Sequence, residues 1–157
     1  SALEKVFALS QVDKDGSLIL KRDYDPSIPE IYGDEDLFIQ AILNIVKNAQ
    51  QALLLTTNPV ITIKSRVSYS QPINGNLHPT LCEVSIIDNG PGIPTDIQEQ
   101  VFFPMVSSKE DGSGLGLSIS QDIIRIHGGA ITFKTKSGET AFSIQIPIKL
   151  NTEVQSA

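Results

Sequence analysis

Short runs of apolar and β-favouring residues, several of them alternating with polar positions, predict five β-strands along the chain. The strands are expected at residues 18–23, 60–68, 81–88, 130–136 and 140–148. In the third run, Cys82, Val84, Ile86 and Asp88 share one face by the strand period of two. A carboxylate on an apolar face is costly unless it accepts hydrogen bonds. Asp88 is therefore a candidate for a buried acceptor.

Helical spacing of apolar residues predicts two main helices. The longer one begins at Gly33-Asp34 with acidic residues in its first turn. Its apolar face is expected at Phe38, Ile42, Ile45, Val46, Ala49 and Leu53. The second helix runs from Leu115 to His127, and its apolar stripe is expected at Leu115, Ile119, Ile123 and Ile126. Shorter helical segments are predicted at 1–11 and 95–101.

The order of these elements predicts the fold class. The strands are mostly neighbours along the chain, and the helices are inserted between them. This arrangement favours a mixed sheet with its helices on one face, which is an α/β (α+β) two-layer sandwich. A chain of 157 residues is long enough for one such domain and short for two.

Composition excludes several classes of function. A net charge of −6 gives no electrostatic basis for binding a nucleic-acid backbone. No stretch approaches the ~20 apolar residues of a membrane span, and the N-terminus lacks the pattern of a signal peptide. The single cysteine, Cys82, lies at an inward strand position, which suits a reduced compartment. A cytoplasmic domain that binds neither nucleic acid nor membrane is expected.

Two glycine-rich turns carry the candidate chemistry. The first is Asp88-Asn89-Gly90-Pro91-Gly92-Ile93-Pro94, at the end of the third strand. The second, Gly112-Ser113-Gly114-Leu115-Gly116-Leu117, opens the second helix, where backbone N–H groups and the helix dipole favour a phosphate. Either turn alone is more often an ordinary turn or helix entry. The chain has no Gly-x-x-x-x-Gly-Lys-[Ser/Thr] sequence and hence no P-loop.

Asn44 and Asn48 lie one helical turn apart on the polar edge of the long helix. Asparagine is a poor residue for a helix interior because its amide competes for backbone hydrogen bonds. One interpretation is an ordinary solvated face. The other is a pair of amide oxygens directed at a triphosphate and its Mg²⁺, a hard cation that prefers oxygen ligands.

Taken together and in this order, these motifs resemble those of the GHKL ATPases, the superfamily of gyrase, Hsp90, the histidine kinases and MutL. Over nearly its whole length the chain resembles the catalytic ATP-binding domain of sensor histidine kinases. The matching segments are 43–49 (N box), 88–92 (first glycine box), 102–104 (F box) and 112–117 (second glycine box). The resemblance implies the GHKL (Bergerat) ATP-binding fold, with ATP and Mg²⁺ as cofactors.

The resemblance also implies roles for individual residues. Asp88 would accept a hydrogen bond from the adenine 6-amino group, and Thr140 would support that contact. Asn48 would ligate Mg²⁺ with Asn44 beside it, both as catalytic residues, and Lys47 would meet phosphate oxygens. The remaining predicted nucleotide-binding residues are Gly90, Gly92, Ile93, Lys109, Gly112, Ser113, Gly114, Leu115, Gly116 and Leu117. Residues 106–112 contain little that can pack, and a mobile lid is expected there.

Three shorter strings, at 22–30, 48–53 and 103–107, are similar to the nitrogen-regulation sensor kinases of the NtrB type. This resemblance implies phosphorylation of a histidine on the kinase's own separate dimerisation domain, relay to an NtrC-type response regulator, and control by a PII-type signal protein. It also implies a division of the chain into three parts. Residues 1–12 would be the remnant of a connection to the dimerisation domain, 13–150 the catalytic domain, and 151–157 a tail.

Two departures from related enzymes bear on the reaction. Hydrolytic GHKL members carry Glu where this chain has Asn44, and an amide cannot take a proton from water. The only histidines are His78 in a loop and His127 at a helix end, where it is expected to act as a cap. Neither has the setting of a phosphoacceptor, which favours transfer to another domain. The alternatives are a stand-alone serine kinase of the anti-sigma type and a nucleotide-dependent module that binds a regulator.

Overall fold

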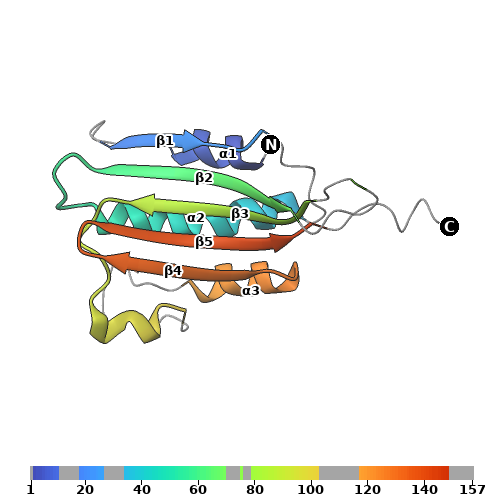
Figure 1. Ribbon diagram of the computed structural model, residues 1–157. Helices are drawn as coiled ribbons and strands as arrows, with labels where there is room; N and C mark the ends of the chain where they lie inside the picture. Colours follow the sequence, from blue (N-terminus) through green and yellow to red (C-terminus); the bar gives the residue numbers. More distant parts are fainter. Residues whose placement is uncertain are drawn as a thin grey trace.

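The computed structural model describes residues 2–10, 18–26, 34–69, 75, 79–102 and 117–148. Its centre is a five-stranded mixed sheet with the strand order β1-β2-β3-β5-β4 (Figure 1). The strands are β1 (Ile19–Asp23), β2 (Val60–Tyr69), β3 (Pro79–Asp88), β4 (Ala130–Lys136) and β5 (Glu139–Pro147). β1 runs parallel to β2, and the other neighbouring pairs are antiparallel. The five predicted strands are confirmed, with small differences at their ends.

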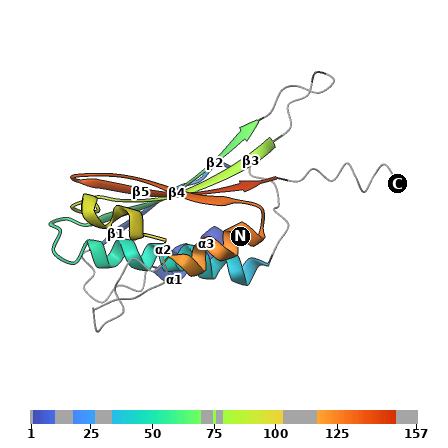
Figure 2. The same ribbon diagram turned by 90° about the horizontal axis from the view of Figure 1, so that it is seen from below.

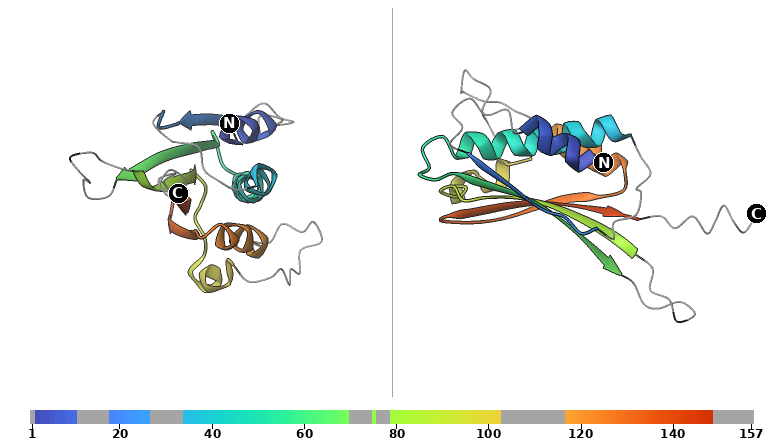
Figure 3. Two further views of the ribbon diagram at one scale, coloured as in Figure 1. Left: turned by 90° about the vertical axis from the view of Figure 1, so that its right-hand side faces the viewer. Right: turned by 90° about the horizontal axis from the view of Figure 1, so that it is seen from above.

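Three α-helices cover one face of the sheet, as Figures 2 and 3 show. They are α1 (Ala2–Ser10), α2 (Glu35–Ala52) and α3 (Ser118–Ile126), and α2 packs against both of the others. A short 3₁₀ helix, η1 (Thr95–Gln100), follows the first glycine turn. The two-layer sandwich is thus confirmed. Within the described residues, no helix has both the length and the apolar character needed to cross a membrane.

α1 is packed into the domain. Val6 is fully buried, and Phe7 is 9% exposed. The Arg22 guanidinium of β1 lies over the Phe7 ring at 4.8 Å and donates to the Glu4 carboxylate at 3.0 Å. This segment therefore contributes to the core, and its role as a link to another domain stays a prediction.

The predicted apolar face of α2 is confirmed. Its buried residues are Phe38, Ala41, Ile42, Ile45, Val46 and Ala49, and Leu53 is buried just beyond the helix end. They share one hydrophobic core with inward-facing strand residues such as Ile61, Ile63, Ile86 and Ile144. The helix begins at this point in the chain because the Asp34 carboxylate accepts hydrogen bonds from the N–H groups of Asp36 (3.0 Å) and Leu37 (3.3 Å).

The predicted apolar stripe of α3 is confirmed at Ile123, which is 6% exposed, but it is wrong at Ile119 and Ile126; Leu115 lies outside the described residues. Ile119 and Ile126 are 53% and 77% exposed, whereas Ser120 and Ile124 are fully buried. The Ser120 hydroxyl donates a hydrogen bond to the Ala41 carbonyl at 2.9 Å. A small hydroxyl that is satisfied by a backbone carbonyl can face the neighbouring helix. A hydrophobic pattern that counts serine as polar would instead place Ser120 on the solvent-exposed face of the helix.

His127 joins the C-terminal end of α3 to the N-terminal end of α2. It is the C-cap residue of α3, as predicted. Its Nδ1 lies 2.7 Å from the Ile123 carbonyl oxygen, and its Nε2 accepts a hydrogen bond from the Asp34 N–H at 3.3 Å. These partners assign the ring proton to Nδ1. The ring also packs against Phe38, with 4.2 Å between the ring centroids. Both ring nitrogens are therefore engaged within the fold.

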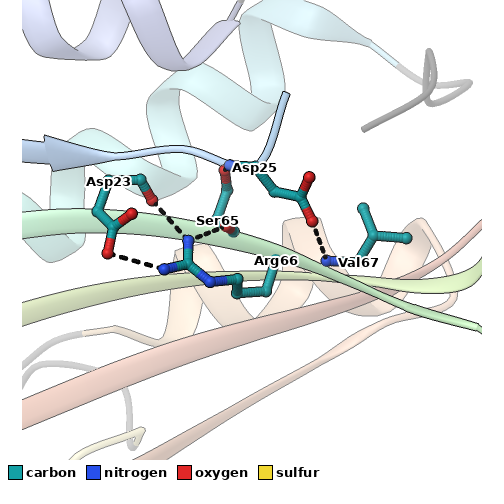
Figure 4. Close-up of polar contacts among 5 residues, drawn as sticks. All are labelled: Asp23, Asp25, Ser65, Arg66 and Val67. Carbon is teal, nitrogen blue, oxygen red and sulfur yellow. Dashed lines mark hydrogen bonds and ion pairs between the residues drawn. The ribbon is translucent and has the colours of Figure 1, made fainter. Parts of the chain in front are cut away.

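A polar cluster, here called the β1 clamp, fastens the end of β1 to β2 (Figure 4). The Asp25 N–H donates to the Ser65 hydroxyl at 3.1 Å, and the Asp25 carboxylate accepts from the Val67 N–H at 3.2 Å. Arg66 donates to the Asp23 carbonyl at 3.0 Å and to the Asp23 carboxylate at 2.8 Å. Ser65 is fully buried, so its hydroxyl requires a partner of this kind.

The substitution Asp25→Ala is expected to lower the free energy of unfolding by about 1–3 kcal/mol, because the partly buried Val67 N–H loses its acceptor. The matched control is Asp23→Ala, which removes a carboxylate from an exposed ion pair with Arg66. Solvent screens that pair, and Arg66 keeps backbone acceptors, so a smaller loss is expected. Urea unfolding followed by circular dichroism compares the two variants. An equal or larger loss for Asp23→Ala would contradict this account of the clamp.

Candidate functional site

Asp88 is the last residue of β3, and its side chain lies on the inward face, as predicted. The residue is 4% exposed, and its Oδ1 accepts a hydrogen bond from the Gly90 N–H at 2.9 Å. Asp88 pairs in register with Thr140 of β5, which is also 4% exposed. A carboxylate and a hydroxyl are therefore neighbours at one end of the sheet. α2 ends at the same end of the molecule (Figure 1).

Burial raises the pKa of Asp88 above its usual value of 3.8. Desolvation of the carboxylate is the largest cause, and the nearby charge of Glu139 adds to it. The Gly90 N–H acts in the opposite direction because it stabilises the charged form. This single donor does not offset the desolvation. A ligand that donates a hydrogen bond to Asp88 would supply the missing stabilisation.

The turn after Asp88 requires glycine at Gly92 and leaves little room for a side chain at Gly90. A Cβ atom at Gly90 would lie 3.0 Å from the Asp88 Oδ1 and 3.3 Å from a methyl carbon of Leu53. Gly92 has a φ of +92°, and a Cβ atom there would lie 2.6 Å from the Lys136 carbonyl oxygen. Gly90 thus leaves room around the carboxylate, and Gly92 allows the turn to lie against the end of β4.

Thr135 of β4 connects this turn to β5. Its Oγ1 accepts a hydrogen bond from the Ile93 N–H at 2.8 Å and lies 2.8 Å from the Oγ1 of Thr140. Thr135 is absent from the residues predicted for the site. Its position on the inward side of β4, two residues after Phe133, is the sequence signal that points to it.

Asn89, whose side chain was also given no predicted role, holds the other flank of the turn. Its Oδ1 accepts from the Val60 N–H at 2.8 Å, and its Nδ2 donates to the Asn58 carbonyl at 2.9 Å. Asn58 has a φ of +53°, a conformation that asparagine tolerates better than most residues. Side chains therefore fix both flanks of the turn that presents Asp88. Asn89 holds the flank beside β2, and Thr135 holds the flank beside β4.

The asparagine edge of α2 leads to the same turn. Asn44, Asn48 and Ala52 follow one another at intervals of four residues and lie in line along the helix. A Cβ atom at Gly90 would lie 3.4 Å from the Ala52 carbonyl oxygen, so this line ends beside the turn. The Nδ2 of Asn48 is buried and has no hydrogen-bond partner among the described residues, which favours a bound polar group. Asn44 is partly buried, and Lys47 is exposed.

The other predicted residues fall into two groups. Leu117 is 2% exposed and belongs to the hydrophobic core, so only its backbone is available to a nucleotide. The following predicted site residues lie outside the described part of the chain, together with the lid expected at 106–112: Lys109, Gly112, Ser113, Gly114, Leu115 and Gly116. Phe102 of the F box packs with its ring centroid 6.0 Å from that of Phe133 and 6.4 Å from that of Phe142.

The described donors and acceptors fit ATP with Mg²⁺. Asp88 is an acceptor suited to an amino group. The Asn48 amide offers one hard oxygen together with a donor that has no partner among the described residues. In the part of the chain that the structure describes, no group of three or more His, Cys, Asp or Glu side chains is placed to hold a metal. A magnesium ion would therefore take most of its ligands from phosphate oxygens and water, which is its usual behaviour in phosphoryl-transfer sites.

Residues 33–150 match the family of histidine kinase-, DNA gyrase B- and HSP90-like ATPases, and the chain belongs to this family. The matched range includes α2, the Asp88 turn and the β4–β5 pair that together form the site.

Among curated proteins, the chain is similar to the sensory histidine kinase/phosphatase NtrB of Vibrio alginolyticus, with 47% identity over 146 residues that cover 93% of this chain and 42% of that protein. NtrB of Salmonella typhimurium is 41% identical over the same coverage. The chain thus spans less than half the length of these relatives.

Solved structures show the same fold. The catalytic domain of the histidine kinase ThkA in a nucleotide-free form has a TM-score of 0.76 and 28% identity, with 94% of this chain and 90% of that chain covered. ThkA in complex with the response regulator protein TrrA has a TM-score of 0.71 and 25% identity, with 94% of this chain and 40% of that chain covered. These likenesses confirm the predicted catalytic-domain fold.

The substitution Asp88→Asn is expected to stabilise the ligand-free domain at neutral pH, because it removes a carboxylate whose charge is penalised by burial. The penalty is absent below the unfolded-state pKa of 3.8 and develops as the pH rises through the higher folded-state pKa. The advantage of the variant should therefore grow across that window and stay constant above it. Urea unfolding of both proteins between about pH 3 and about pH 8 measures the effect. Equal stability throughout would contradict the raised pKa.

Proposed function

We propose that this chain is the ATP-binding catalytic domain of a sensor histidine kinase and that it transfers the γ-phosphoryl group of ATP to a histidine on a separate dimerisation domain. The observation that carries this proposal is the buried Asp88 carboxylate in a member of a family of ATPases. The carboxylate is presented by a turn that requires glycine at Gly92 and has little room for a side chain at Gly90. Likeness to the catalytic domain of ThkA supports the kinase branch of that family.

In this proposal the two sides of the site have different tasks. Asp88 accepts a hydrogen bond from the adenine 6-amino group, and Thr140 lies beside it in register. Asn48 contributes an oxygen ligand to Mg²⁺, with Asn44 and Lys47 next to it on α2 facing the phosphates. The second glycine box at 112–117 and Lys109 are proposed to contact phosphates as well. When bound, Mg²⁺ neutralises charge on the phosphate oxygens during transfer.

Transfer to a protein side chain is favoured over hydrolysis. Asn44 carries an amide, which cannot remove a proton from an attacking water. His127 is not free to act as an acceptor, because its Nδ1 and Nε2 are both hydrogen-bonded within the fold. The acceptor histidine is therefore expected to come from a dimerisation domain that docks in line with the γ-phosphate. The remaining histidine, His78, lies outside the described residues.

The nitrogen-regulation type is the branch that we propose for the whole protein. Relatives with 40–47% identity are named NtrB, and they extend well beyond the part that this chain covers. An NtrC-type response regulator is the proposed recipient of the phosphoryl group, and a PII-type signal protein the proposed regulator, in the cytoplasm. The structure of ThkA with its response regulator supports docking of a regulator on a kinase of this fold.

Replacing Asp88 with Asn is expected to weaken binding of Mg²⁺-ATP by about ten- to a hundredfold, since a hydrogen bond to a charged acceptor contributes ~1.5–3 kcal/mol. ATP and ADP should lose the same factor because the contact is to the base. Isothermal titration calorimetry measures both affinities, with Asp23→Asn in the exposed part of the β1 clamp as the control. Unchanged affinity in Asp88→Asn would remove Asp88 from the proposed site.

The chain by itself is expected to bind ATP, hydrolyse it slowly and remain unlabelled by γ-labelled ATP. Addition of a histidine-bearing dimerisation domain should lead to labelling of that domain. Asn48→Ala should reduce the rate by ~10–100-fold, the usual scale for losing support to a bound metal. Rapid self-labelling or labelling of a serine on a partner protein would favour a stand-alone serine kinase. ATP binding without any transfer would favour a regulator-binding module.

A further inference from the structure

We propose that Thr135 is a positioning residue for recognition of the base, which anchors the Asp88 turn and fixes the direction in which the Thr140 hydroxyl donates. The inference rests on the proposed ATP site and adds a residue that lies outside all of the boxes described above. Thr135 belongs to β4, more than forty residues after Asp88 in the sequence.

The sheet places Thr135, Thr140 and Asp88 in one row across three strands. Thr135 of β4 is the register partner of Thr140 of β5, and Thr140 is the register partner of Asp88 of β3. The Oγ1 atoms of Thr135 and Thr140 are 2.8 Å apart. The Thr135 Oγ1 also accepts from the Ile93 N–H at 2.8 Å. The Thr135 hydroxyl thus connects Ile93 of the glycine turn to Thr140, the residue beside the Asp88 carboxylate.

The hydrogen-bonding capacity of a hydroxyl limits what this row can do. A threonine hydroxyl has one proton to donate and two lone pairs that accept. In Thr135, the Ile93 N–H occupies one lone pair, so the proton or the other lone pair is available to Thr140. If Thr135 donates, the Thr140 hydroxyl keeps its own proton for a ligand. If Thr140 donates instead, it can offer a ligand only lone pairs.

The chemistry of adenine selects the first arrangement. A carboxylate can only accept, so Asp88 suits the 6-amino group of adenine. The ring atom next to that amino group is N1, which is an acceptor and needs a donor, either directly or through one water. Thr140 can be that donor when Thr135 supplies the proton between the two hydroxyls. A purine with a 6-keto group would place an acceptor against the Asp88 carboxylate, which is also an acceptor, so binding of such a base is disfavoured.

Two variants separate this role from simple support of the turn. Thr135→Val keeps the shape of the side chain but removes the hydroxyl, whereas Thr135→Ser keeps the hydroxyl. Thr132→Val is the matched control, because it makes the same change on the same strand but on the opposite face. There the hydroxyl of the exposed Thr132 accepts a hydrogen bond from the Gln145 side chain at 3.3 Å.

The test pairs each variant with a change of a single base atom. Calorimetry gives the affinities of wild type and variants for ATP and for 1-deaza-ATP, in which a C–H group replaces N1. Wild type is expected to prefer ATP by about two- to tenfold, the scale of one hydrogen bond. The preference should fall in Thr135→Val, because the Thr140 hydroxyl keeps its proton but its direction is no longer fixed, and it should persist unchanged in Thr135→Ser and Thr132→Val. If Thr135→Val does not fold, Thr135→Cys takes its place, with a reduced preference expected because a thiol is a weak donor.

Four results would overturn the proposal. Equal weakening of both nucleotides in Thr135→Val, with the preference kept, would mean that Thr135 supports the turn alone. Tighter ATP binding by Thr135→Val would mean that Thr140 is the donor of the pair. ATP binding that depends on Asp88 but not on Thr135 would overturn this inference and leave the proposed function intact. A wild-type chain that binds no ATP would overturn both.

Discussion

Burial of the Asp88 carboxylate is the constraint on which the rest of the site depends. The group is almost completely removed from solvent and has one backbone donor, and its pKa is raised as a result. Burial therefore penalises the charged form of this group, and the hydrogen bond from the Gly90 N–H offsets only part of that penalty. Burial of such a group lowers the free energy of unfolding of the ligand-free protein. A ligand that donates a hydrogen bond to the carboxylate recovers that free energy on binding. The absence of a side chain at Gly90 keeps room around the carboxylate, and the absence of one at Gly92 lets the turn lie against the end of β4.

The register of the sheet decides which groups surround this carboxylate. Thr140 is its neighbour because β5 pairs with β3, and Thr135 is the next in the row because β4 pairs with β5. On the other flank, Asn89 ties the turn to the start of β2, and the last turn of α2 meets the turn at Gly90. The proposed base side of the site is thus built on strands and a helix, which hold side chains more rigidly than loops do.

The sequence indicated those features that depend on one element at a time. The inward position of Asp88 follows from the period of a single strand, and the buried face of α2 follows from the period of a single helix. The orientation of α3 could not be predicted in this way, because it depends on a hydrogen bond from Ser120 to a carbonyl of α2. Thr135 and Asn89 were missed for the same reason, since their hydrogen-bond partners lie on other strands and turns. The ligand contacts of Asn44, Asn48 and Lys47 stay predictions that rest on resemblance.

The β1 clamp joins residues 40 to 43 positions apart in the sequence, and all of α2 lies between them. Through hydrogen bonds and an ion pair, the clamp therefore closes a loop of the chain that contains the helix with Asn44 and Asn48. Closure of a loop of this length is opposed by chain entropy, which the parallel pairing of β1 with β2 has to outweigh. Opening of the clamp releases that loop, so we expect α2 and β1 to loosen as one cooperative unit. The lifetime of the arrangement around Asn48 is then set partly by residues that never touch a nucleotide.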